Sequence, residues 1–341
     1  MVAPTPLDAA PASVRRTPSK PVLLVGLTTG LGVILVALLM LFIMPSLKSG
    51  AHNLPIGLAG PSSAVTQVEE DLDAAAPGAY TTREFASEAA LRDAVRDRDV
   101  VGGIVVDEGV VGGVGVHALV AGAGSTAISA TISRTAQSLA EKAGTTAEIE
   151  DVVPLPESDP TGVGIGGLAF PLVFGGIVPA VAFRKVFSRS LGWAVCGILA
   201  FAAVGGIVVA AVLMFVFGSI TTAFWPVAAA MALGIAGLAL PLAGLQEVFG
   251  GKGFTIGAMI MMFVGNPLAG IATGATWLPA GLGAIGQVLP PGAAGTLVRS
   301  SAYFGGAGGL AAGLTLAAWV AAGGLLLAVG ARRTRLAATS R

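Results

Sequence analysis

Long apolar runs on either side of one polar stretch dominate the pattern of this chain. The first run covers residues 22–44. It is long enough to cross a bilayer, because a hydrocarbon core of about 30 Å needs about 20 helical residues. Three cations precede it, as in a signal peptide, but the run is longer than a signal-peptide core and no small-residue cleavage site precedes Pro45. An uncleaved membrane anchor is therefore predicted.

A second group of apolar runs fills residues 162–331, divided by short polar breaks. The runs predict five helices, over residues 163–183, 191–217, 223–245, 254–272 and 310–329. Together with the anchor they predict a polytopic α-helical membrane protein with six transmembrane helices.

Residues 273–306 contain too many helix breakers for a continuous span. Pro279, Pro290 and Pro291 lie there among several glycines. Irregular backbone at membrane depth must be buried in protein, so the segment is predicted to dip into the outer leaflet without crossing it. Arg299 is expected at the outer interface, with its aliphatic stem along apolar surface.

The polar stretch between the anchor and the bundle shows strand and helix patterns in turn. Strands are predicted near residues 54–58, 79–85, 103–106, 114–120 and 149–153, and helices after caps at Ser62 or Ser63, at Ser87 and at Ser125. The order β-α-β-α-β-β-α-β predicts a small mixed sheet covered by helices. The stretch is long enough for a core of its own.

Charge divides the chain in the same way. The 19 basic and 19 acidic residues balance, but 17 of the acids lie between Lys48 and Thr161. This acidic excess argues against nucleic acid as a partner of that stretch. Eleven of the 19 basic residues lie in the two tails and in the short loops that share their side of the membrane. The positive-inside rule then places both termini in the cytoplasm and the acidic domain outside.

The predicted organisation therefore has five parts, in a bacterial plasma membrane. They are a cytoplasmic tail over residues 1–20, a transmembrane helix over 21–46, an extracytoplasmic α/β domain over 47–161, a five-helix transmembrane bundle over 162–331 that includes the re-entrant segment 273–306, and a cytoplasmic tail over 332–341.

Few residues suggest chemistry. Cys196 is the single cysteine, which excludes an intrachain disulfide and a cysteine metal site. His52 and His117 are far apart in sequence, and each is interpreted as a surface residue. A solvated helix face is predicted for four charged residues at helical spacing, namely Arg92, Asp93, Arg96 and Asp97. No acid, base and nucleophile are grouped as in a hydrolase, so no catalytic, cofactor-binding or metal-ligating residue is expected.

Two glycine patterns imitate nucleotide-binding motifs. Residues 162–167 and 281–286 satisfy G-x-G-x-x-G, but a dinucleotide site needs a preceding strand and an acid about 20 residues further on. No G-x-x-x-x-G-K-[ST] motif occurs, which excludes ATP binding by that route. Glu247 is the one acid within the bundle, which weighs against a proton- or ion-coupled carrier.

One N-terminal helix, an extracytoplasmic α/β domain and five further helices resemble the membrane subunits of type-2 ABC exporters, especially the phage-infection-protein-like branch. Residues 53–58 (NLPIGL) resemble the strand that opens the outer domain of that family. Residues 86–106 resemble its helix followed by a G-x-I-V-V strand, and residues 277–305 its proline-punctuated stretch before the last helix. The outer domain is shorter here than in many members, and no ATPase is fused.

The resemblance implies an export permease that works with an ATPase on a separate chain, as a homodimer or heterodimer. The near absence of charge in the bundle favours an amphiphilic or lipid-like substrate over ions. The alternative is a membrane-anchored binding or scaffold protein whose outer domain recognises an envelope component. In a permease, the inner loop is expected to receive the ATPase through an apolar anchor ringed by cations. Its residues are Arg184, Lys185, Val186, Phe187 and Arg189. In the alternative interpretation these cations only set the orientation.

Overall fold

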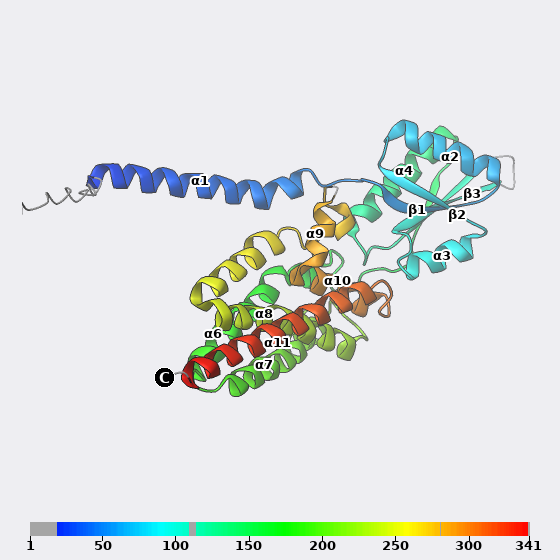
Figure 1. Ribbon diagram of the computed structural model, residues 1–341. Helices are drawn as coiled ribbons and strands as arrows, with labels where there is room; N and C mark the ends of the chain where they lie inside the picture. Colours follow the sequence, from blue (N-terminus) through cyan, green and yellow to red (C-terminus); the bar gives the residue numbers. More distant parts are fainter. Residues whose placement is uncertain (1–18, 109–113, 280, 340–341) are drawn as a thin grey trace, which may run out of the picture.

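The computed structural model describes residues 19–108, 114–279 and 281–339. An α/β domain, called here the outer domain, sits at one end of a helical bundle, and a long N-terminal helix extends beside the bundle (Figure 1). Residues 1–18 of the predicted N-terminal tail lie outside the described residues, and so does Arg341 of the predicted C-terminal tail.

The described residues of the outer domain form a five-stranded mixed sheet in the order β2-β1-β3-β4-β5. β1 is parallel to β2 and β3, β4 is antiparallel to β3, and β5 is parallel to β4. The elements are β1 (Leu54–Ala59), α2 (Ser62–Ala75), β2 (Tyr80–Phe85), α3 (Glu88–Arg96), β3 (Gly102–Glu108), β4 (Val114–Val120), α4 (Thr126–Lys142) and β5 (Ala147–Asp151). The predicted order of strands and helices is confirmed.

Alternation along β1 gives the sheet two separate cores, because successive side chains point to opposite faces. Leu54, Ile56 and Leu58 are buried in one core with residues of α2 and α4. Ala59 lies in the other core with Leu91 of α3. α2 and α4 thus cover one face of the sheet and α3 covers the other (Figure 1).

Serine caps start two of the three helices in this domain. The Oγ of Ser87 accepts a hydrogen bond from the Ala90 N–H (3.2 Å), and the Oγ of Ser125 accepts one from the Ile128 N–H (3.3 Å). The predicted cap of α2 is wrong, because Pro61 occupies the N-cap position and no described side chain caps the first turn. Proline suits this position because it has no N–H of its own to satisfy.

Within the described part of the chain, five helices are long and apolar enough to cross a membrane. They are α1 (Lys20–Leu47), the stretch Val163–Val186 made of α5 (Val163–Gly166) and α6 (Ala169–Val186), the stretch Leu191–Val216 made of α7 (Leu191–Ala211) and η1 (Val212–Val216), the stretch Phe224–Gly265 made of α8 (Phe224–Met259) and η2 (Ile260–Gly265), and α11 (Leu310–Thr339). This architecture is that of a helical membrane protein with several apolar spans.

The helices predicted over residues 223–245 and 254–272 are joined without a loop. Within α8, Gly250 alone leaves the helical conformation, with φ 67° and ψ −160°. The chain folds back there, since a Cβ at Gly257 would lie within 3.0 Å of the side chains of Leu242 and Leu245. The predicted boundaries are therefore wrong, because one glycine in a conformation reserved for glycine is enough to reverse the helix.

The arm of α8 before Gly250 forms the centre of the bundle. It packs against α6, α7, α11 and α10 (Pro290–Tyr303). Two glycines bring neighbouring helices close to its backbone: Gly206 of α7 lies against Ala232, and Gly323 of α11 lies against Leu240. Small residues at such contacts let helices approach closely in a membrane, where van der Waals packing drives association.

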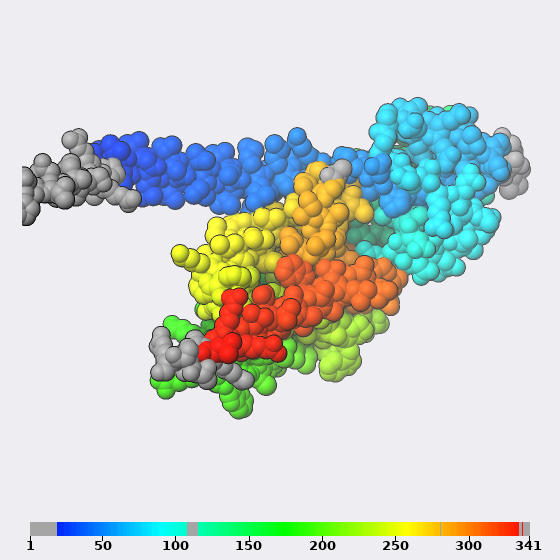
Figure 2. Space-filling view, viewed as in Figure 1, coloured from blue at the N-terminus to red at the C-terminus, as the bar shows by residue number. Residues whose placement is uncertain are grey.

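α1 stands apart from this bundle (Figures 1 and 2). Most of its side chains are exposed, and it meets η2 through an edge-on aromatic contact between Phe42 and Phe263, whose ring centroids are 6.3 Å apart. Its length and unbroken apolar surface fit an environment of lipid tails.

The segment over residues 273–306 contains three short helices. They are η3 (Ala275–Trp277), α9 (Leu282–Val288) and α10. The extended residue Leu289 (φ −88°, ψ 146°) separates α9 from α10, and Pro290 and Pro291 occupy the first turn of α10. The predicted interruption of the helix is therefore confirmed, and the depth of the segment in a membrane stays a prediction.

Candidate functional sites at the two ends of the bundle

The bundle has two different ends. At the outer end, the Ser158 Oγ donates to the Gly218 carbonyl (2.7 Å) and the Tyr303 hydroxyl donates to the Ser219 carbonyl (2.8 Å). At the far end, Glu247 contacts both Arg184 at the end of α6 and Gly330 of α11. The loop between α6 and α7 is therefore separated from the outer domain by the length of the bundle.

Two residues of the predicted docking loop contact side chains of the neighbouring helices. The Arg184 Nη2 lies 2.6 Å from the Glu247 carboxylate, and the two side chains are only 16% and 13% exposed. The ring of Phe187 stacks with Phe183 (6.4 Å between centroids) and Trp193 (6.3 Å). The packed ring of Phe187 is therefore less available as an apolar anchor than the sequence suggested.

The other three residues of this loop point outward. Val186 is 71% exposed, and Lys185 and Arg189 are also exposed. An exposed aliphatic side chain between two cations still has the layout of a docking surface, with Val186 as the exposed one of the two apolar residues in this loop. The docking role itself stays a prediction.

Arg299 lies where α10 meets the outer domain, and it is 6% exposed. Its Nη1 donates to the Ala123 carbonyl (2.6 Å) and its Nη2 donates to the Ile271 carbonyl (2.5 Å). The guanidinium is therefore not in contact with solvent, because two backbone acceptors replace water around the buried cation, and the position of Arg299 at the outer interface stays a prediction. Arg299 thereby joins the β4–α4 loop of the outer domain to the bundle.

Phe304 and Ser125 complete this junction. Phe304, 9% exposed, lies in the same core as Leu91 and Val95 of α3. The Ser125 Oγ donates to the Thr273 carbonyl (2.5 Å). The outer domain is thus packed onto the segment 273–306 by an aromatic side chain and hydrogen bonds.

Asp159 fixes the point where the chain enters the bundle. Asp159 is 8% exposed, and its carboxylate accepts hydrogen bonds from the N–H groups of Val163 and Gly164, both at 2.9 Å. A carboxylate in this position satisfies N–H groups that the first turn of a helix leaves free. The glycine at 164 also leaves room for Ser219, so the G-x-G-x-x-G pattern here serves a tight helix start.

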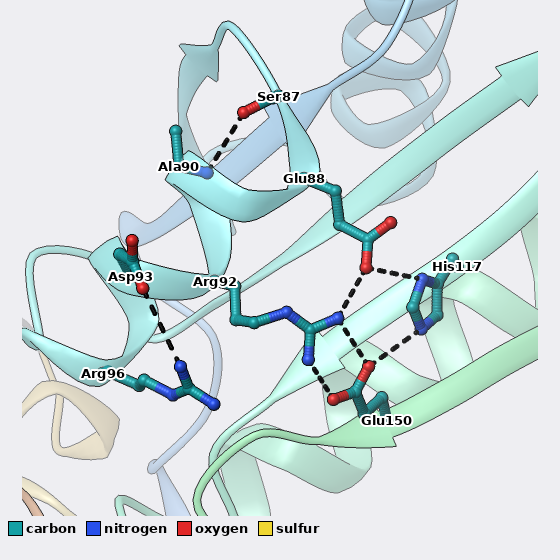
Figure 3. A network of polar contacts seen from close by, with 8 residues as sticks. All are labelled: Ser87, Glu88, Ala90, Arg92, Asp93, Arg96, His117 and Glu150. Atoms are coloured by element: carbon teal, nitrogen blue, oxygen red, sulfur yellow. Dashed lines mark hydrogen bonds and ion pairs between the residues drawn. The ribbon is translucent and has the colours of Figure 1, made fainter.

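A polar network on the outer domain joins α3, β4 and β5 (Figure 3). Arg92 contacts the Glu88 carboxylate at 2.6 Å and both oxygens of Glu150. The two ring nitrogens of His117 lie 3.5 Å from Glu88 and 3.6 Å from Glu150. The hydrogen bond from Arg92 holds the pKa of Glu150 below its ordinary value, and the two carboxylates raise the pKa of Arg92.

This network corrects two interpretations of the sequence. The side chain of His117 is 18% exposed and faces two carboxylates, so it is not a plain surface residue. Arg92 does not lie on the solvated helix face that was predicted for it, whereas Arg96 is exposed there. Glu88, His117 and Glu150 lie close enough together to hold a metal ion. Arg92 already pairs with both carboxylates, so the arrangement is better described as an ion-paired network.

Comparison with known proteins does not define a family for this chain. No protein-family model matches it, and neither the curated proteins nor the solved structures include a significant match. The fold and the two ends of the bundle define a class, a helical membrane protein that carries an α/β domain on one end of its bundle.

Proposed function

We propose that this chain is the membrane subunit of an exporter that moves an amphiphilic or lipid-like substrate outward, driven by an ATPase on a separate chain. The main support is the packed connection between the two ends of the bundle. Arg299 and Phe304 fix the outer domain to one end, and the loop between α6 and α7 lies at the other. Packed side chains and rigid helices of this kind can carry coupling between two distant sites.

Charge supports an orientation with this loop in the cytoplasm. Exposed cations gather at the end of the bundle away from the outer domain, namely Lys185, Arg189, Lys252, Arg332 and Arg333. Cations near short loops favour the cytoplasmic side. The acidic outer domain is then extracytoplasmic, and both termini are inside.

The reversal at Gly250 supports a six-span arrangement as part of the proposal. The arm before Gly250 has 26 residues from Phe224 and is long enough to cross the hydrocarbon core. The arm after it ends at Gly265 and is shorter. Buried residues of the following irregular segment, such as Leu268 and Ile271, continue it toward the outer end. Irregular backbone at that depth is acceptable where protein surrounds it.

A dimer is part of the proposal. Apart from the contact near Phe42, the apolar sides of α1 are open to lipid or to a second subunit. In this arrangement each subunit presents one inner loop to the ATPase, with Val186 at the centre of the contact and Lys185 and Arg189 beside it.

ATP hydrolysis by the complex purified from its native membranes tests this proposal. The wild-type chain is expected to carry an ATP-hydrolysing subunit through purification. Val186→Asp should insert normally and lose that activity, because a charge replaces the apolar centre of the contact. Ile149→Asp is the matched control, since Ile149 is also an exposed aliphatic residue (37%) but lies on the outer domain.

Two results would contradict the proposal. A wild-type complex without any ATP-hydrolysing partner, in cells whose amphiphile export is unchanged by deletion of this chain, would favour the scaffold alternative. A Val186→Asp chain that retains a fully active ATPase would remove the docking role from this loop.

A further inference from the structure

A cavity of about 260 Å³ lies at the junction of the outer domain with the bundle. The outer domain contributes the turn after α3 and the loop between β4 and α4, and the bundle contributes the residues after η2 and the facing sides of α9 and α10. The recess between the cyan outer domain and the orange α9–α10 segment is visible in Figure 2. Both parts of the molecule are therefore needed to form it.

Two arginines line this cavity, Arg98 from the outer domain and Arg299 from α10. Among the residues that the structure describes, no carboxylate lines the cavity or forms an ion pair with either arginine. The Nη1 of Arg98 is buried and has no hydrogen-bond partner among them. A buried guanidinium donor without an acceptor is costly unless a ligand supplies one.

The surroundings of Arg98 hold its cation in place. Its guanidinium lies over the ring of Phe304, with 4.9 Å between its central carbon and the ring centroid. Its backbone has a φ of 63°, a conformation that non-glycine residues adopt infrequently. Burial lowers the pKa of Arg98 from its ordinary value, as expected for a cation with no nearby anion.

The start of α4 adds to the positive potential. Its N-cap residue Ser125 and first-turn residue Ile128 line the cavity, so the positive end of a 17-residue helix faces it. The remaining walls are largely apolar, with Val95, Val100 and Phe304 among them. The cavity thus combines anion donors with an apolar rim.

We propose that this cavity binds the phosphate of an amphiphile head group, held between Arg98 and Arg299. A phosphate can accept from Arg98 and from the helix start, while Arg299, whose terminal nitrogens already donate to two carbonyls, contributes its positive charge. The volume is below that of most sites for whole small molecules, so the cavity takes the head group while the tails lie outside it. The assignment rests on the proposed function and deepens it, because it names the chemistry by which an exported amphiphile is recognised.

Binding to the purified full chain in a neutral detergent, without any ATPase, tests the site. Short-chain phosphatidylglycerol is titrated calorimetrically, with the diacylglycerol of the same chain length as the probe that lacks phosphate. We expect saturable binding of phosphatidylglycerol at one site per chain and none of the diacylglycerol. Arg98→Gln should weaken binding about tenfold or more, because it removes a charge-assisted hydrogen bond.

Two further variants separate binding from folding. Thr276→Glu places a carboxylate at an exposed position of the lining, leaves both arginines intact, and should weaken binding to a similar extent. Arg96→Gln is the matched control, because Arg96 is exposed on the same helix end and outside the cavity. Its affinity should equal that of the wild type.

Inorganic phosphate added as a competitor identifies the source of the ligand. Displacement of the lipid by inorganic phosphate assigns the site to the phosphate group alone, and retention of the lipid assigns it to a lipid head group. Equal binding of diacylglycerol, absence of binding by either phosphate probe, or wild-type affinity in both Arg98→Gln and Thr276→Glu would overturn the proposal. Because no ATPase is present, such a result rejects the site and leaves the export function to its own test.

Discussion

Single charged residues join the parts of this molecule. Arg299 donates to carbonyls of the outer domain and the bundle, and Asp159 accepts from the first N–H groups of the bundle. Arg184 pairs with Glu247 at the opposite end. Each of these groups is largely buried, and a buried charge is tolerated when hydrogen bonds or an opposite charge compensate it.

The pair between Arg184 and Glu247 gives a first prediction. Glu247→Gln leaves the guanidinium of Arg184 largely buried without its counter-charge, and should destabilise the bundle by about 3 kcal/mol. Exchanging the two residues, with Arg184→Glu and Glu247→Arg together, should recover much of the loss. The measurement is the free energy of unfolding in detergent for the single and double variants. A Glu247→Gln variant as stable as the wild type would show that the pair contributes little.

A second prediction concerns pH and Glu150. Its pKa is lowered in the folded chain by the hydrogen bond from Arg92. The stabilisation is therefore complete at neutral pH and is lost as the pH falls through the lowered pKa. Glu150→Gln should reduce protection of β5 amides from hydrogen exchange at pH 7, by no more than about 1 kcal/mol because the group is partly exposed. The wild type and the variant should converge at acid pH, and a difference that is independent of pH would contradict the assignment.

The position of His117 shows what residue patterns can and cannot reveal. Alternation along β4 places His117 on the same face as Leu119, which is buried under α3, so its partial burial was predictable from period two. Its neighbours Glu88 and Glu150 come from elements distant in sequence. No local sequence pattern predicts contacts between residues so far apart in the chain, and only the folded structure reveals them.

At the scale of elements, sequence periodicity predicted the outer domain well and the bundle less well. Most strands and helices of the outer domain have the apolar spacing that their class requires, as β1 and α3 do. In the bundle, the polar residues between 245 and 254 predicted a break that contains Gly250, but hydropathy alone did not show that a single glycine makes the reversal. The predicted loop is wrong in its length, because only Gly250 leaves the helical conformation and its neighbours stay helical on both sides.

The reversal at Gly250 gives a third prediction. Gly250→Ala should destabilise the chain by about 1–3 kcal/mol, because its backbone conformation is one that only glycine adopts without strain. Space is not the cause, since a Cβ there would meet no atom within 4 Å. Gly251→Ala is the control, because a Cβ there is equally free of contacts. It should be neutral or stabilising by up to about 1 kcal/mol. Equal thermal stabilities in detergent would contradict this account of the turn.

The aromatic anchor of the junction gives a fourth prediction. Phe304→Ala should cost about 3–5 kcal/mol at the junction, because it empties a site in the core under α3 and removes the ring beneath Arg98. Hydrogen exchange should then increase in α3 and in the loop between β4 and α4. Phe249→Ala, at a residue that is 61% exposed, should leave both segments unchanged. Unaltered exchange in Phe304→Ala would show that the junction does not depend on this ring.

At the scale of the whole molecule, the junction between domain and bundle is the feature that the sequence concealed. The contact of Arg299 with Ala123 spans 176 positions, and that of Ser125 with Thr273 spans 148. Ser125 was predicted only as a helix cap and Arg299 only as an interfacial residue, and no sequence pattern pairs either of them with a residue so distant in the chain. The division of charge between the outer domain and the loops was visible at once, because it depends on composition alone.

Sidedness is the central claim on which export, docking and the head-group site all depend. Cysteine accessibility in intact cells tests it most directly, in a chain with Cys196→Ala that carries either Ser63→Cys on the outer domain or Ser188→Cys in the inner loop. Both serines are exposed. A membrane-impermeant maleimide should label the Ser63→Cys chain in intact cells and the Ser188→Cys chain only after permeabilisation. Labelling of both chains in intact cells, or the reverse order, would contradict the account.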